Sequence, residues 1–181
     1  MGPGIRLWVA EVFTRVTRMH GLRLICLVPL LIATAAFACP AASVRRGPVD
    51  VALAASKAGY VVGEAVELTL TVTNWGVGTV TYRFNDAQRY DFVVMRENGA
   101  VAWQWSHDKA FAQVLGTLTL PPGDSRVYRE GWDQKNIDGE AVVPGRYVVE
   151  GIYPPRRPPG IPGVAQQRGP RVMINVSPLL R

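Results

Sequence analysis

The sequence predicts an all-β protein: an immunoglobulin-like antiparallel β-sandwich of about seven to nine strands that follows an N-terminal signal peptide. Apolar and polar residues alternate in short runs after residue 50, most regularly from Val66 to Thr73. Turn signals such as Asn98-Gly99 and Pro144-Gly145 separate these runs about every ten residues. No stretch of about ten residues in this part has a helical period, so strands and turns are expected throughout.

The strands are expected where the side-chain period is two, because neighbouring residues of a strand point to opposite faces. In residues 66–73 the apolar side chains share one face and Glu and Thr share the other, and residues 79–84 alternate in the same way. The other predicted strands are 50–56, 90–96, 101–105, 115–120, 125–132, 146–153 and 171–176. Tyr147 opens a late strand after Pro144-Gly145, as in a tyrosine corner, whose hydroxyl bonds to an upstream backbone group.

Residues 1–38 are predicted to be an N-terminal lead and a signal peptide. Arginines, the last of them Arg23, precede an uncharged run with an apolar core at Leu24–Leu31. Ala36-Phe37-Ala38 then supplies the A-x-A cleavage pattern. A start at Met19 in place of Met1 would shorten the lead. We therefore expect a secreted protein or one of the cell envelope, in the periplasm or at the cell surface.

Two alternatives stay open at this end of the chain. Cys39 directly follows Ala38, as in a lipoprotein whose cysteine is acylated after cleavage, so Cys39 is a candidate for lipidation. The uncharged run is also about as long as a minimal membrane helix, so an uncleaved anchor is the other alternative. Contact with a membrane is expected only through such an anchor or lipid.

The rest of the chain is predicted to be one domain, with a linker at 39–49 and a sandwich at 50–181. A proline-rich loop is expected over 154–170, because proline cannot join the inside of a sheet. The cysteines are Cys26 and Cys39 alone, so the core must stabilise the domain without an internal disulfide. Residues 1–38 hold four Arg and one Glu of a chain with net charge +6, which leaves +3 for the rest. No basic patch carries interleaved aromatics, so no nucleic-acid partner is expected.

Eight short motifs occur in one order along the predicted sandwich. They are YVVGE at 60–64, LTLTVTN at 68–74, QRYDFVV at 88–94, VAWQWS at 101–106, FAQ at 111–113, LPPG at 120–123, WDQ at 132–134 and PGRY at 144–147. On these motifs the chain from about Ser56 to Tyr153 resembles the BsuPI-type intracellular proteinase inhibitor family. The resemblance implies an immunoglobulin-like sandwich and inhibition of serine proteinases.

Two features depart from what the resemblance implies. An activity inside the cell does not fit an export signal, and the proline-rich loop after Tyr153 is an elaboration of this sequence. No reactive-site motif of the family can be carried over residue by residue. We therefore expect an exported serine-proteinase inhibitor that binds a protein partner through a loop. The alternative is a non-inhibitory immunoglobulin-like protein-binding or structural module of the cell envelope.

The candidate contact with a proteinase is Pro155, Arg156, Arg157 and Pro158 in the proline-rich loop. Proline stiffens an extended segment and lowers the entropy cost of docking it as a substrate. Arg156 is the better anchor for the S1 pocket of a trypsin-like proteinase, because Pro158 hinders cleavage after Arg157. The alternative is a stiff linker or a ligand for a polyproline-binding groove.

No enzyme activity and no cofactor are expected. Ser106-His107-Asp108 is not a catalytic triad, because neighbours on a strand point to opposite faces and cannot bond in the required order. Residues 132–140 resemble a calcium loop only in part, so a turn is preferred over a weak calcium site at Asp133, Asn136, Asp138 and Glu140. No set of His and Cys suits zinc.

The tryptophans divide into core and surface candidates. Trp103 and Trp105 share one strand face and are expected to be buried against Tyr90 and Phe92. Trp75 follows a strand end and precedes two glycines, so it is the better candidate for an exposed aromatic side chain. Arg89, Asp91 and Asp133 are expected to form a structural polar network.

Overall fold

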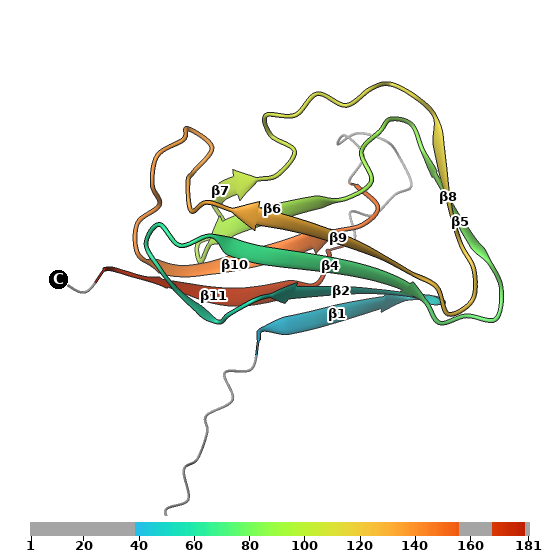
Figure 1. The fold of residues 1–181 in the computed structure, drawn as a ribbon, viewed down its shortest axis with the longest axis horizontal. Helices are drawn as coiled ribbons and strands as arrows, with labels where there is room; N and C mark the ends of the chain where they lie inside the picture. Colours follow the sequence, from blue (N-terminus) through green and yellow to red (C-terminus); the bar gives the residue numbers. More distant parts are fainter. Residues whose placement is uncertain (1–38, 156–167, 180–181) are drawn as a thin grey trace, which may run out of the picture. The chain divides into compact units, whose positions relative to one another are not determined.

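The computed structural model describes residues 39–155 and 168–179, and these residues form strands joined by turns and loops (Figure 1). The strands are β1 (Ala41–Arg46), β2 (Val49–Ala55), β3 (Gly59–Val61), β4 (Val66–Asn74), β5 (Val80–Phe84), β6 (Asp91–Arg96), β7 (Val101–Gln104), β8 (Gly116–Leu120), β9 (Ser125–Trp132), β10 (Gly145–Ile152) and β11 (Arg171–Ser177). Within these described ranges, no helix is both long enough and apolar enough to cross a membrane.

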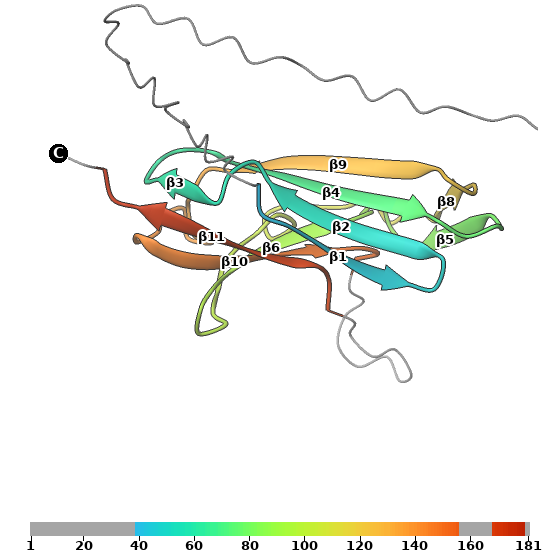
Figure 2. The same cartoon turned by 90° about the horizontal axis from the view of Figure 1, so that it is seen from below.

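Two sheets form the layers of the fold, as Figure 2 shows from the side. One has four strands in the order β1-β2-β4-β9, all antiparallel. The other has five strands in the order β3-β11-β10-β6-β7, in which the β3–β11 pair is parallel. A separate ribbon of β5 and β8 extends from one end of the sheets (Figure 1). The predicted all-β class is confirmed.

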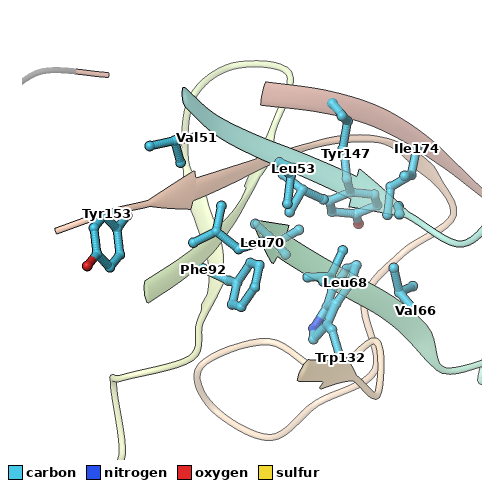
Figure 3. Close-up of a cluster of buried hydrophobic side chains, with 14 of the residues drawn as sticks. Val51, Leu53, Val66, Leu68, Leu70, Phe92, Trp132, Tyr147, Tyr153 and Ile174 are labelled. Carbon is cyan, nitrogen blue, oxygen red and sulfur yellow. The ribbon is translucent and has the colours of Figure 1, made fainter. Parts of the chain in front are cut away.

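The core lies between the two sheets and follows the alternation of the sequence. Val66, Leu68, Leu70 and Val72 of β4 are fully buried, while Glu67 faces solvent. The facing sheet contributes Val149 and further apolar side chains, of which Phe92, Tyr147 and Ile174 are labelled in Figure 3. Burial of this apolar surface stabilises the sandwich at about 25 cal/mol per Å² removed from water.

Two aromatic side chains pack in the core and also donate a hydrogen bond to the backbone of a neighbouring loop. The Tyr147 hydroxyl donates to the Val143 carbonyl at 2.6 Å, which is the upstream bond that the tyrosine-corner pattern predicts. Trp132 is fully buried between Trp103 and Tyr147, and its indole N–H donates to the Lys135 carbonyl at 2.8 Å. Each ring thus fills space in the core, while a backbone carbonyl accepts the hydrogen bond of its polar group.

The first part of the predicted linker is a strand. Residues 39–49 were expected to connect, but Ala41–Arg46 pair with β2 over six residues as β1. The half-buried face of this strand consists of Ala42, Val44 and Arg46, so its sequence lacks a strong apolar alternation. Pairing of its six residues with the edge of β2 places it in the sheet, and Ala42 packs against the core. The short strand β3 was also missed.

Two predicted segments lie wholly or mostly outside the described residues. The lead and signal peptide, 1–38, lie outside the described residues, as does most of the predicted loop 154–170. Of that loop, Arg168–Pro170 precede β11 without strand structure, and Gly169 and Pro170 are buried.

Candidate functional site

Aromatic side chains line the side of the sandwich where β9 faces β6 and β7. Tyr128 lies on β9 opposite Leu70 of β4 and therefore points toward the inner face. Tyr90 stacks on Tyr128 at 4.3 Å and on Trp105 at 4.5 Å between ring centroids. Phe111 packs against Trp105 at 5.8 Å. We call Phe111, Trp105, Tyr90 and Tyr128 the aromatic row; it joins β9 to the chain that follows β7.

The aromatic row also contains a polar contact. The Tyr90 hydroxyl donates to the Glu130 carboxylate, and both residues are half-buried. Burial, followed by this hydrogen bond, raises the pKa of Tyr90 above its ordinary range. The tyrosine is therefore a neutral hydrogen-bond donor at physiological pH and does not act as a base.

Asp91 joins the start of β6 to the end of β7 through its buried carboxylate. Its Oδ1 accepts from the backbone N–H groups of Phe92 at 2.9 Å and Ser106 at 3.2 Å. Its Oδ2 accepts from Gln104 Nε2 and from Ser106 Oγ, each at 2.6 Å. The carboxylate is 4% exposed, so these donors replace the water that a free carboxylate would bind.

The segment between β7 and β8, residues 105–115, is the β7–β8 loop, drawn as the long loop along the top of Figure 1. Trp105 and Phe111 belong to both this loop and the aromatic row, and the stacking of Trp105 on Tyr90 attaches the loop to the sandwich. Lys109 Nζ lies 5.1 Å from the Trp105 ring centre. The Ala112 carbonyl accepts a hydrogen bond from Ala87 N–H at 2.9 Å. The loop is therefore held by packing and by backbone hydrogen bonds at several points.

An open pocket of about 200 Å³ lies between the start of this loop and the β9–β10 loop, residues 133–144. Trp103, His107 and Asp108 line one side, and Lys135 and Ile137 line the other. Ile137 N–H donates to the Ala102 carbonyl at 2.9 Å and so ties the β9–β10 loop to β7. The lining therefore combines charged and apolar side chains.

The structure separates the residues of the rejected triad. Ser106 Oγ donates to Asp91, while His107 is exposed at the pocket rim. The calcium candidates form a turn: Asn136 Oδ1 accepts from the N–H groups of Asp138 at 3.0 Å and Glu140 at 2.9 Å. Across residues 39–155 and 168–179, no group of three or more His, Cys, Asp or Glu could hold a metal ion.

The expected network of Arg89, Asp91 and Asp133 has different partners. Asp91 belongs to the network above, and Asp133 pairs with Lys135 at 3.2 Å on the surface. Arg89 donates to the backbone carbonyls of Asp86 and Gln88, and its guanidinium lies 4.4 Å from the centre of the Phe84 ring.

The tryptophan predictions are confirmed in part. Trp105 does contact Tyr90, but Trp103 and Trp105 are both half-buried. Trp103 lies on β7, the edge strand of its sheet, and Trp105 follows the last residue of that strand, Gln104. Trp75 is exposed, as expected, with 61% of its surface accessible.

The residues of the predicted proteinase contact are only partly described. Pro155 is half-buried, and Arg156, Arg157 and Pro158 lie outside the described residues. Cys39 is exposed, and its thiol donates to the Ser56 carbonyl at 3.0 Å. Lipidation of Cys39 stays a prediction.

The sequence interpretation did not single out the end of the β7–β8 loop, where apolar side chains are exposed. Val114 and Leu115 are exposed, at 56% and 85% of their surface, although both are apolar. The available signal was the pair of adjacent apolar residues before the strand at 116–120, which breaks the alternation that burial requires.

The chain matches one family model, described as BsuPI, intracellular proteinase inhibitor, over residues 53–157. No curated protein matches the chain in sequence. The family description names an intracellular protein and contradicts the predicted secreted or cell-envelope location. That prediction was wrong, because a basic stretch, an apolar run and small residues form a compositional pattern that does not by itself require export.

Solved structures share only a limited likeness with the chain. A β-glucosidase from Erythrobacter marinus is 14% identical, with a TM-score of 0.41, and the match covers 69% of this chain and 15% of that one. The DNA glycosylase AlkC from Pseudomonas fluorescens is 14% identical, with a TM-score of 0.41 and coverage of 68% and 28%. A CARDB domain from Pyrococcus furiosus is 14% identical, with a TM-score of 0.37 and coverage of 71% and 90%. The chain thus spans less than a third of the first two proteins.

Proposed function

Because this chain belongs to the BsuPI family of intracellular proteinase inhibitors, we propose that it inhibits a serine proteinase by binding it through a loop. The observation that carries the proposal is the family match over residues 53–157, which runs from β2 to the chain after β10. It includes the aromatic row, the Asp91 network and the β7–β8 loop. An inhibitor family also supports a binding role without catalysis.

Loop-mediated binding agrees with a fold in which loops connect the paired strands of two sheets packed on one core. We propose an immunoglobulin-like arrangement, which agrees with β2, β4 and β9 in one sheet and β11, β10, β6 and β7 in the other. The pairing of β3 with β11 is parallel and departs from the antiparallel arrangement of the other strands. A rigid scaffold lowers the entropy lost on binding, so more of the contact energy appears as affinity.

The sequence-based candidate for the contact is the segment Pro155, Arg156, Arg157 and Pro158. Arginine in the primary pocket would direct the inhibitor to trypsin-like proteinases, since such a pocket carries a carboxylate. Replacing Arg156 and Arg157 together by alanine tests this contact. Weaker inhibition of a trypsin-like enzyme by the double variant would support it, and unchanged inhibition would refute it.

The function itself is tested by titration of proteinases with the purified full-length chain. A subtilisin-like and a trypsin-like enzyme are each mixed with increasing inhibitor, and hydrolysis of a small chromogenic peptide is followed. Inhibition that is complete near equimolar inhibitor would support the proposal. Rapid digestion of the chain, or hydrolysis that continues at the full rate, would refute it and favour a non-inhibitory protein-binding module.

A further inference from the structure

The β7–β8 loop presents two adjacent apolar side chains to solvent. Leu115 is 85% exposed and Val114 is 56% exposed, and both precede the first residue of β8. Single exposed apolar residues are ordinary on protein surfaces. A consecutive pair at one loop end keeps more apolar surface in water, and burial against a partner would be favourable because it removes that surface from water.

The chain before this pair is restrained. Phe111 packs against Trp105, which itself stacks on Tyr90. The Ala112 carbonyl accepts hydrogen bonds from Ala87 N–H and from Val114 N–H, both at 2.9 Å. These contacts fix the backbone on one side of Leu115, while the Leu115 side chain stays free.

Arg89 restrains the backbone that follows Val114 and Leu115. Gly116 pairs with Phe84 in the β5–β8 ribbon, and a Cβ at Gly116 would lie 2.2 Å from Nη2 of Arg89. The guanidinium therefore lies directly against the backbone that follows Leu115. Arg89 is itself held by the carbonyls of Asp86 and Gln88 and by the Phe84 ring.

We infer that Leu115 enters the primary specificity pocket of the target, a serine proteinase whose pocket is apolar. This inference rests on the proposed function and names the loop and the class of enzyme. Proteinases bind an extended segment with one side chain in that pocket, and a loop held on both sides loses little entropy on docking. An apolar pocket takes leucine without leaving a buried charge unpaired, whereas the carboxylate of a trypsin-like pocket would lack a partner.

The inference also assigns the bond that the proteinase attacks. If the bound loop is cleaved, the peptide bond between Leu115 and Gly116 breaks. Water then supplies the hydroxyl of the new Leu115 carboxyl group and the proton of the new Gly116 amine. Because Phe111, Ala112 and Arg89 still hold the two ends, we expect cleavage to be slow and the cleaved ends to stay near each other.

The test uses the full-length chain and three variants. Leu115→Asp places a charge in the pocket, and Leu115→Arg exchanges an apolar side chain for one that a trypsin-like pocket binds. Val77→Arg is the matched control, because Val77 is fully exposed in a different loop. All variants change exposed side chains, so circular dichroism and thermal unfolding should show the wild-type fold.

Inhibition constants for a subtilisin-like and a trypsin-like enzyme decide the result. Leu115→Asp should weaken inhibition of the subtilisin-like enzyme by about 30-fold or more, the size expected for a central contact residue. Leu115→Arg should weaken it similarly and create inhibition of the trypsin-like enzyme, and Val77→Arg should match wild type. Mass spectrometry after long incubation should locate cleavage at Leu115–Gly116.

Different results would refute the inference about Leu115 and the proposed function. If wild type inhibits and the Leu115 variants inhibit equally well, or if cleavage maps to residues 155–158, the inference is wrong while inhibition stands. If wild type slows neither proteinase, the proposed function is wrong and the inference falls with it.

Discussion

Replacing Asp91 by alanine would remove the buried carboxylate that joins the start of β6 to the β7–β8 loop. A hydrogen bond to a charged group contributes about 1.5–3 kcal/mol to stability. Asp91 accepts four such bonds, but two of them come from Ser106 and are not independent. The substitution also removes the desolvation cost of the buried charge, on the order of several kcal/mol, and this gain offsets part of the lost hydrogen bonding. We therefore expect a net loss of about 2–4 kcal/mol in the free energy of unfolding.

The asparagine variant separates shape from charge. Its side-chain oxygen can keep the two backbone bonds made by Phe92 and Ser106, and Gln104 can rotate its amide to accept from the new NH₂ group. Asp91→Asn should therefore lose only about 1 kcal/mol, because the packing and most of the hydrogen bonds are kept.

The assay is urea unfolding at neutral pH, followed by tryptophan fluorescence. The slope of the unfolding free energy against urea should stay constant while the midpoint falls. Asp138→Ala, at an exposed carboxylate in the β9–β10 turn, serves as the control and should change stability by less than about 0.5 kcal/mol. An Asp91→Ala variant as stable as that control would refute the role assigned to Asp91. So would an asparagine variant no more stable than the alanine variant.

Three further predictions concern single residues, and each is measured by the same unfolding assay. Burial, with the neighbouring tyrosines Tyr128 and Tyr82, raises the pKa of Tyr153; its proton is kept in the folded state but lost on unfolding above about pH 10, so stability is complete below that pH and falls as the pH rises. Tyr153→Phe should lose the share of this fall that comes from Tyr153, about 1.4 kcal/mol per pH unit, so stability should fall less steeply with pH, and an unchanged slope would contradict the assignment. Gln134 has φ of 60° and its side chain binds the backbone of residues 61–64; Gln134→Ala and Gln134→Gly should both be destabilised, with the glycine variant about 1 kcal/mol more stable, and equal stabilities would refute backbone strain at this site. A Cβ at Gly169 would lie 1.8 Å from the Gly151 carbonyl oxygen, so Gly169→Ala should lose about 1–3 kcal/mol, and wild-type stability would show that the two segments are not in contact.

Most strands could be predicted because their signal is local. The alternation at 66–73 matches β4, whose apolar side chains are buried. β1 could not be predicted in this way, since its residues are only half-buried on one face and it exists through its pairing with β2. Trp105 shows the same limit. The strand period predicted that it shares a buried face with Trp103, but β7 ends at Gln104. The Trp105 side chain instead stacks on Tyr90 in the aromatic row.

The two candidate contacts, residues 155–158 and Leu115, depend on different kinds of signal. The sequence pointed to Arg156 and Arg157, because proline and arginine are conspicuous in a linear chain. Leu115 attracts no notice there, since an apolar residue near a strand is ordinarily expected in a core. Its exposure, and the position of Arg89 against Gly116, depend on how β5 and β8 pair.

The amino-acid sequence by itself determined the all-β class, the positions of most strands along the chain, the tyrosine corner at Tyr147 and the family. These follow from side-chain period, turn residues and short motifs, which are properties of neighbouring residues in the chain. The tertiary structure alone decided which apolar residues stay in water and which donors surround Asp91. Those features depend on long-range pairing and packing, since a side chain is buried only where another part of the chain covers it.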